Sequence, residues 1–354
     1  MNKILNCLAN KVMCTAVVAL GAFAACAESV LTTNALYDAV NTDVSVGYQV
    51  SGLEGDEIAV VFTNDACEVI NWKVPADLYK VKFLVVGGGG GGGGAASANS
   101  AVAGAGGGGG GVVTGVVGRL NGKSKITVKV GAGGLGGVKS TSTSTGKGVA
   151  SKLSENSTFK LDGVYEVIAY GGGGDLGKSN KGDNGGSNAG SRRDEVNTDV
   201  PKKGYISDEF KILCEGVETF GYLGGKAARV DSYGSGGGGG AIEAGQNEKR
   251  KTGELTIAGR GGHGLTSDIT GVQLIYGAGG GGGITKNAAE ASGDADVGAG
   301  RGGRESVEAQ HALANQGGGG GGGTKVGNGG NGGSGIVVFR FKNPSQPGFK
   351  VIVR

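Results

Sequence analysis

The chain has 354 residues, of which 82 are glycine and only 4 are proline. An average protein contains about 7% glycine, so this composition is far outside the usual range. Collagen is excluded because the sequence has neither a glycine at every third position nor the proline that a triple helix needs. The formal net charge is only +3. It offers no long-range field for nucleic acid or an anionic membrane, so we expect no nucleic-acid partner.

Residues 1–27 have the pattern of a signal peptide. Two lysines flank the start of an uncharged apolar stretch at 12–25, and Ala25-Cys26-Ala27 forms a small-residue cleavage site before Glu28. The apolar stretch is shorter than the about 20 residues that span a membrane, so a cleaved signal is favoured over an uncleaved anchor. We expect no transmembrane segment after the signal is removed.

Cysteine usage gives two further expectations. The sequence Phe-Ala-Ala-Cys at 23–26 resembles the acylation site of bacterial lipoproteins, so a lipid anchor at Cys26 is the alternative to full secretion. The mature chain keeps Cys67 and Cys214, which could form a disulfide in an oxidising compartment. Two separate thiols are the alternative, because sequence alone does not place the two residues within bonding distance.

The N-terminal part of the mature chain differs from the rest. Residues 28–52 predict a linker with one short helix at about 31–42. Apolar and β-branched residues then predict three strands, at 58–63, 68–74 and 79–86.

Six runs of four or more glycines dominate the middle of the chain. Apolar, β-branched segments adjoin them, and a last strand is predicted at 335–342. We expect this strand to pair with the early strands and close the domain from both ends, leaving a tail at 343–354. The runs are 87–94, 106–111, 171–174, 236–240, 279–283 and 317–323.

The glycine runs have two interpretations, as flexible linkers or as ordered polyglycine-II helices. The pieces between the runs are mostly too short to hold a core of their own, which favours one cooperative domain over 53–342. Within it, 175–235 is predicted to be a long charged insertion. The predicted fold class is mainly β with a bundle of packed polyglycine-II helices, and with few or no α-helices after the signal peptide.

Such helices are stable only when many of them pack together. A polyglycine-II helix has three residues per turn and no internal hydrogen bonds, so each N–H and C=O must bond to a neighbour. Ordering a glycine costs about 0.5–1 kcal/mol more than ordering an alanine. Each hydrogen bond between helices returns about 0.5–1.5 kcal/mol, so many such bonds are needed.

An ordered set of motifs resembles a known family. It comprises Trp72-Lys73-Val74-Pro75-Ala76, then Val81–Val86 leading into glycines 87–94, then Gly261–Leu265, and finally Gly329–Val338. This set is similar to the glycine-rich domain of many bacterial exported proteins and of phage tail-fibre tip adhesins. A similar region occurs in the ectodomain of anaplastic lymphoma kinase.

The resemblance covers about residues 55–342 and implies a β-rich frame around packed polyglycine-II helices. In the phage adhesins such a bundle is a rigid platform whose variable tip loops bind a receptor, so no binding residue carries over by motif. The signal peptide and the charged insertion at 175–235 depart from the phage proteins. They favour a secreted bacterial protein on the same scaffold.

Signals for chemistry are weak. Gly172–Ser179 matches a phosphate-loop pattern, but helix breakers follow where the mechanism needs a helix. Of the two histidines, His263 lies in a glycine patch and is expected as a turn residue, and the other is His311. A hydrolase would need a pocket that joins one of them to a serine or an aspartate, and no G-x-S-x-G elbow supports one.

Metal and cofactor signals are equally weak. No Cys/His spacing fits zinc, so we expect neither a metal nor a cofactor. Asp294 and Asp296 could supply one pair of carboxylates to calcium. An acidic surface loop is favoured, because the full twelve-residue loop is absent.

The predicted insertion carries the candidate binding residues, because arginine and aromatic side chains are favoured in binding hot spots. The alternative is that these aromatic residues pack the insertion onto the platform. The candidates are Arg192, Arg193, Tyr205, Phe210, Phe220, Tyr222 and Tyr233.

The sequence thus predicts a non-enzymatic protein that is secreted or on the cell surface. It would act as a rigid scaffold that presents loops to an extracellular protein or glycan. A purely structural protein of the cell envelope or matrix is the alternative, and a secreted hydrolase is the third.

Overall fold

A computed structural model describes nine stretches of the chain, which together contain most of the predicted domain. The predicted signal peptide, the helix at 31–42, Cys67 and the tail from 345 onward lie outside the described residues. The stretches are 48–63, 69–95, 102–139, 154–175, 184–192, 199–228, 233–249, 256–285 and 291–344.

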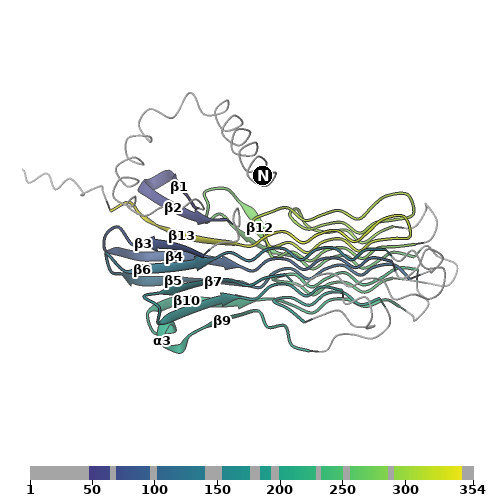
Figure 1. The fold of residues 1–354 in the computed structure, drawn as a ribbon, viewed down its shortest axis with the longest axis horizontal. Helices are drawn as coiled ribbons and strands as arrows, with labels where there is room; N and C mark the ends of the chain where they lie inside the picture. The colour runs from purple at the N-terminus through teal and green to yellow at the C-terminus, as the bar shows by residue number, and fades with distance from the viewer. Residues whose placement is uncertain are drawn as a thin grey trace, which may run out of the picture.

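Two antiparallel sheets lie at one end of the molecule (Figure 1). The larger sheet has the order β1 (Tyr48–Gly52), β2 (Glu57–Phe62), β13 (Ile336–Lys342), β4 (Leu78–Val86), β5 (Val112–Leu120) and β10 (Cys214–Phe220). The smaller has the order β3 (Val69–Lys73), β6 (Lys125–Lys129), β7 (Ser157–Leu161), β8 (Tyr165–Ala169) and β9 (Gly204–Ile206). The remaining elements are short: the hairpin of β11 (Leu265–Ser267) and β12 (Leu274–Tyr276), η1 (Glu54–Asp56) and α3 (Asp208–Lys211).

The predicted closure of the domain by its last strand is confirmed. β13 lies between β2 and β4, with Val337 opposite Phe62 on one side and Val85 on the other. The three early strands are present within a residue of their predicted starts. They do not stay together, however, because β3 pairs with β6 in the smaller sheet. The predicted mainly β fold with almost no helix is also confirmed.

The core lies between the two sheets and is rich in aromatic rings. Trp72 of β3 packs against Phe339 of β13, with ring centroids 5.5 Å apart. Phe159 of β7 meets Phe339 edge-on at 5.1 Å and Phe210 of α3 at 5.7 Å. All four side chains are fully buried. A smaller cluster around Tyr276 packs the β11–β12 hairpin onto the other face of the larger sheet.

The chain leaves the strands as long extended segments that run side by side to the far end of the molecule (Figure 1). Segment 102–111 shows their hydrogen bonding. Every third N–H, starting at Gly104, donates to a carbonyl oxygen of segment 317–323 at 2.8–2.9 Å. In the next set, Gly108 and Gly111 donate to carbonyl oxygens of segment 170–175, and Ala105 donates to the Asp175 side chain. The third set, Gly106 and Gly109, bonds segment 235–240. This period of three is that of a polyglycine-II helix, so the predicted bundle is present.

Segment 102–111 is the centre of the bundle. Its N–H groups reach three neighbours, and its carbonyl oxygens accept from three others, so six segments surround it. The three acceptor-side neighbours are 87–94, 184–192 and 277–283. The runs that look like low complexity in the sequence are therefore an ordered, hydrogen-bonded part of the fold.

Segment 175–235 is built into this frame and is not an appendage. It supplies β9 and β10, the edge strands of the two sheets. Its residues 184–192 also bond the central segment, since Ser187 donates to Gly109 at 3.0 Å and Gly190 donates to Gly106 at 2.9 Å. The sequence could not show this, because those bonds join residues about 80 positions apart.

A single methyl group in the central segment tests this packing. A Cβ added at Gly107 would lie 2.2 Å from the carbonyl oxygen of Gly90. We expect Gly107→Ala to lower the free energy of unfolding by at least about 3 kcal/mol, since the backbones cannot separate without breaking hydrogen bonds. Urea denaturation provides the measurement. Gly118→Ala in β5 is the control, because its nearest contact would be 3.7 Å away, and equal midpoints for the two variants would contradict the bundle.

Candidate functional site

The three-residue period decides which side chains reach the surface of the bundle. Residues at i and i+3 of a polyglycine-II helix point to the same side. In the segment Ile257–Gly264, the larger residues Ile257, Arg260 and His263 follow this spacing, and the residues between them are glycines or a buried alanine. Most inward positions are glycine or another small residue, so the large side chains of this segment lie on its outward row.

Five such rows lie side by side and line a groove of about 490 Å³. Hydrogen bonds join neighbouring segments, as from Gln246 N–H to Arg260 O at 2.8 Å and from Gln310 N–H to Arg301 O at 2.9 Å. Each row contributes two residues three positions apart. They are Gln246 and Lys249, Ile257 and Arg260, Ala291 and Asp294, Arg301 and Arg304, and Val307 and Gln310.

Ion pairs hold two of the arginines in place. Nη2 of Arg260 lies 2.6 Å from Oδ1 of Asp296, and Nη2 of Arg301 lies 2.9 Å from Oδ1 of Asp294. Partial burial would raise the pKa of Asp294. Hydrogen bonds from the Ala295 N–H and from Arg301, together with the arginine charges, bring that pKa below its usual value. Asp294 is therefore ionised at neutral pH and neutralises Arg301 across the groove.

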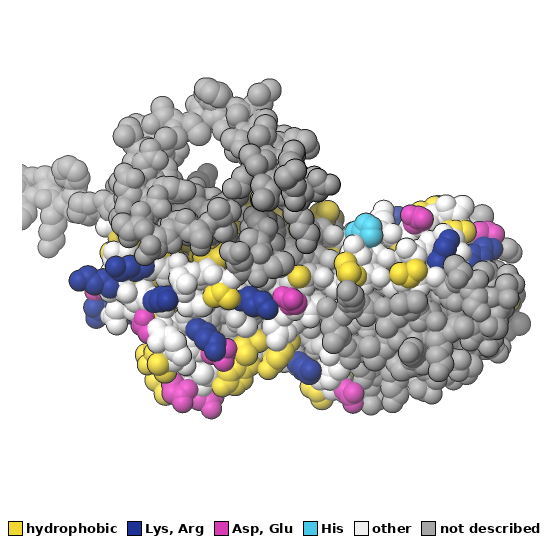
Figure 2. Space-filling model, viewed as in Figure 1, with side chains coloured by type: hydrophobic (Ala, Val, Ile, Leu, Met, Phe, Trp, Pro, Cys, Tyr) yellow, Lys and Arg dark blue, Asp and Glu magenta, His cyan; other side chains and the backbone are white. Residues whose placement is uncertain are grey.

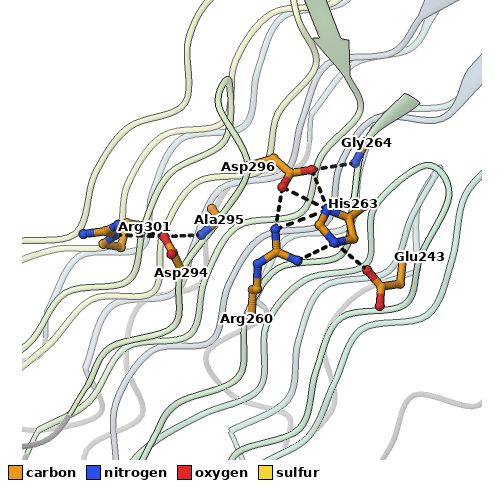
Figure 3. Close-up of polar contacts among 8 residues, drawn as sticks. All are labelled: Glu243, Arg260, His263, Gly264, Asp294, Ala295, Asp296 and Arg301. Atoms are coloured by element: carbon orange, nitrogen blue, oxygen red, sulfur yellow. Dashed lines mark hydrogen bonds and ion pairs between the residues drawn. The ribbon is translucent and has the colours of Figure 1, made fainter. Parts of the chain in front are cut away.

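His263 lies in a cluster of charged groups next to the groove (Figure 3). Its Nδ1 is 3.0 Å from both carboxylate oxygens of Asp296, and its Nε2 is 2.7 Å from Nη1 of Arg260. Glu243 Oε2 lies 3.2 Å from Nε2, and the Gly264 N–H donates to Asp296 at 3.1 Å. The cluster fixes the guanidinium of Arg260 at the groove.

The expectation that His263 serves only as a turn residue misses these contacts. The signal that could have found them is the spacing of three from Arg260, which places both side chains on one row. Asp296 comes from a segment more than 30 positions away, and sequence alone does not bring it there.

A hydrolase would need His263 to contact a serine or an aspartate and to lie in a pocket. The cluster meets the first requirement and not the second. His263 contacts an aspartate, but it is not among the residues that line the groove. Within the described stretches, no serine or threonine hydroxyl bonds its ring, and no three His, Cys, Asp or Glu side chains are placed to hold a metal ion. His311 accepts a hydrogen bond from the Asn331 N–H at 2.8 Å, a contact that joins two surface segments.

The phosphate-loop sequence lies partly outside the described residues. Its first glycines belong to the bundle, where Gly172 N–H donates to Gly88 and Gly173 N–H donates to Ser187, both at 2.8 Å. Those amides are paired with backbone, so they do not form a phosphate cradle.

The candidate residues of segment 175–235 do not form one site. Arg192 is buried and pairs through Nε with Oδ2 of Asp175 at 2.5 Å, and Arg193 lies outside the described residues. Phe210 is in the core between the sheets. Tyr205 and Tyr222 are exposed, by 47% and 44%. The remaining two, Phe220 and Tyr233, are half-buried.

Cys214 has no disulfide partner among the described residues and is half-buried in a second groove between β9 and β10. Burial raises the pKa of this thiol to about 11, so it is protonated and unreactive at neutral pH. Its predicted partner Cys67 lies outside the described residues, so the disulfide stays a prediction. Exposed Ile212 and Leu213 lie close by in the chain, and Figure 2 shows hydrophobic side chains gathered at this end of the molecule.

The fold is a β-sandwich joined to a bundle of glycine helices. The chain belongs to the glycine-rich domain family, whose model matches residues 63–342. A search of curated proteins finds no significant match. Among the described residues, no helix is long and apolar enough to cross a membrane.

Removing the charge of Asp296 tests the cluster. Asp296 is 11% exposed and accepts hydrogen bonds from Arg260, His263 and Gly264. We expect Asp296→Asn to lower the free energy of unfolding by about 1.5–3 kcal/mol, since bonds to a charged acceptor are lost and Arg260 is left unpaired.

Thermal and urea denaturation measure this loss. The control is Asp268→Asn, because Asp268 is 78% exposed and lies 3.7 Å from its nearest arginine. Its effect should stay within about 0.5 kcal/mol. An Asp296→Asn variant as stable as this control would show that the cluster does not support the fold.

Proposed function

We propose that the protein is exported and acts as a rigid, non-catalytic scaffold. Secreted or held on the cell surface, it presents side chains and loops to an extracellular protein or glycan. The proposal rests on the rows of side chains that point outward at every third residue of a glycine helix. The bundle fixes where each larger side chain of a glycine helix emerges, as for Ile257, Arg260 and His263.

Rigidity supports the scaffold role. Each segment of the bundle is hydrogen-bonded to several others, and a partner that meets pre-ordered side chains loses little conformational entropy on binding. Most interior positions are glycine, and the buried polar side chains among them, such as Asp175 and Ser235, bond neighbouring groups of the bundle. Such a bundle is suited to holding surface side chains in fixed positions rather than to catalysis.

Two surfaces support binding over a purely structural role. One is the groove on the side of the bundle, which is lined by charged and amide side chains. The other is at the sandwich end, where Tyr205 lines the second groove and Tyr222 packs under the Nζ of Lys203 at 5.6 Å from the ring centroid. Exposed tyrosines of this kind are favoured in binding surfaces.

Export rests on the signal-peptide pattern of residues 1–27. When the full chain is expressed in a bacterial host, we expect the processed protein to begin at Glu28, as measured by N-terminal sequencing and intact mass. A processed form that begins at Cys26 with added acyl mass would establish a lipid anchor instead. An unprocessed chain retained in the cytoplasm would contradict the proposal.

Binding is tested with the mature protein on a glycan array and on intact cells. We expect a specific interaction that weakens about tenfold or more in the double variant Tyr205→Ala, Tyr222→Ala if the partner meets the sandwich end. Tyr79→Ala is the control, because Tyr79 is also exposed, by 59%, but does not line the second groove. Absence of any interaction with glycans and cells would leave the purely structural role.

A further inference from the structure

The groove on the side of the bundle has an excess of positive charge. Four basic side chains line it, Lys249, Arg260, Arg301 and Arg304, against two acidic ones, Asp294 and Glu308. Ion pairs with aspartates neutralise Arg260 and Arg301. Among the described residues, Lys249, Arg304 and Glu308 form no ion pair, so two positive charges and one negative charge remain to meet a ligand.

The spacing of these groups is set by the glycine helices. Residues at i and i+3 repeat at about 9 Å along a helix that rises about 3.1 Å per residue. Arg301 and Arg304 therefore leave the backbone at about this interval on one row. Arg301 is paired with Asp294, and the other unpaired cation, Lys249, lies on a different row. A ligand that pairs both Lys249 and Arg304 must therefore lie across the rows.

The uncharged lining groups favour a ligand rich in hydroxyls. Gln246, Gln310 and Ser292 offer amide and hydroxyl groups that both donate and accept hydrogen bonds. The larger apolar lining is limited to Ile257 and Val307, and no aromatic residue lines the groove. A protein partner would need apolar or aromatic anchors in pockets, which this open polar surface does not provide.

We propose that this groove binds an acidic polysaccharide, with Lys249 and Arg304 pairing its carboxylate or sulfate groups and the amide side chains bonding its hydroxyls. This inference rests on the proposed binding function and names its ligand class and site. Arg260 and Arg301 are held by their aspartates on two different rows and contribute hydrogen-bond donors. Glu308 opposes the ligand charge.

Binding of the mature protein to polygalacturonate, dextran sulfate and neutral dextran tests the proposal, with polyglutamate as the acidic peptide. We expect both charged polysaccharides to bind at low salt and to be released as salt screens the charges. The tighter of the two identifies carboxylate or sulfate as the preferred group. Dextran binding as tight as theirs, or polyglutamate binding as tight, would overturn the ligand class.

Charge variants locate the site. The double variant Lys249→Gln, Arg304→Gln should weaken polysaccharide binding about tenfold, and Glu308→Gln should tighten it about threefold. The matched control is Lys73→Gln, Lys342→Gln, which removes the same charge from exposed positions on β3 and β13. Equal binding by the double variant and its control would overturn the groove assignment.

The two proposals fail differently. If the intact protein binds glycans or cells and the groove variants bind equally well, the acidic-polysaccharide site falls while the scaffold function stands. If the intact protein binds neither glycans nor cells, the binding function itself falls. Circular dichroism and the urea midpoint of each variant confirm that a loss of binding is not a loss of fold.

Discussion

Backbone hydrogen bonding between chains without side chains is the interaction on which this structure depends. Segment 102–111 bonds six neighbours, almost entirely through backbone N–H and carbonyl groups. The backbones can approach closely enough for these hydrogen bonds only where no Cβ lies between them, as at Gly107. The glycine content is therefore a packing requirement, in the way that large apolar residues are required in an ordinary core. The entropy lost by each glycine is offset only because nearly every amide finds a partner.

The sandwich and the bundle depend on each other. The strands β4 and β8 lead directly into glycine segments, and β5 and β13 directly follow them, so the sheet sets the starting register of each helix. The aromatic core around Trp72 and Phe339 supplies the hydrophobic stabilisation that the bundle lacks. The bundle in turn extends away from the sheets and carries charged residues on its surface, apart from the aromatic core.

Local patterns predicted the local structure. Apolar, β-branched segments located β2, β3, β4 and β13, and the small pieces between glycine runs indicated one ordered bundle rather than linkers. Sequence reasoning stopped at contacts between distant segments. It treated 175–235 as an insertion, although β9 and β10 complete both sheets, and it did not join His263 to Asp296. Those contacts follow from which helices are neighbours, and runs of identical residues carry no information about their neighbours.

The period of three also constrains how such a chain can change length. Each residue of a polyglycine-II helix turns the chain by a third of a turn. Adding or deleting one residue within 257–263 would rotate the downstream part of that row toward the interior, where the backbone leaves no space. A change of three residues would restore the same face. The outward rows therefore behave like a reading frame, in which substitutions at Arg260 or Arg304 alter the surface while single-residue indels alter the fold.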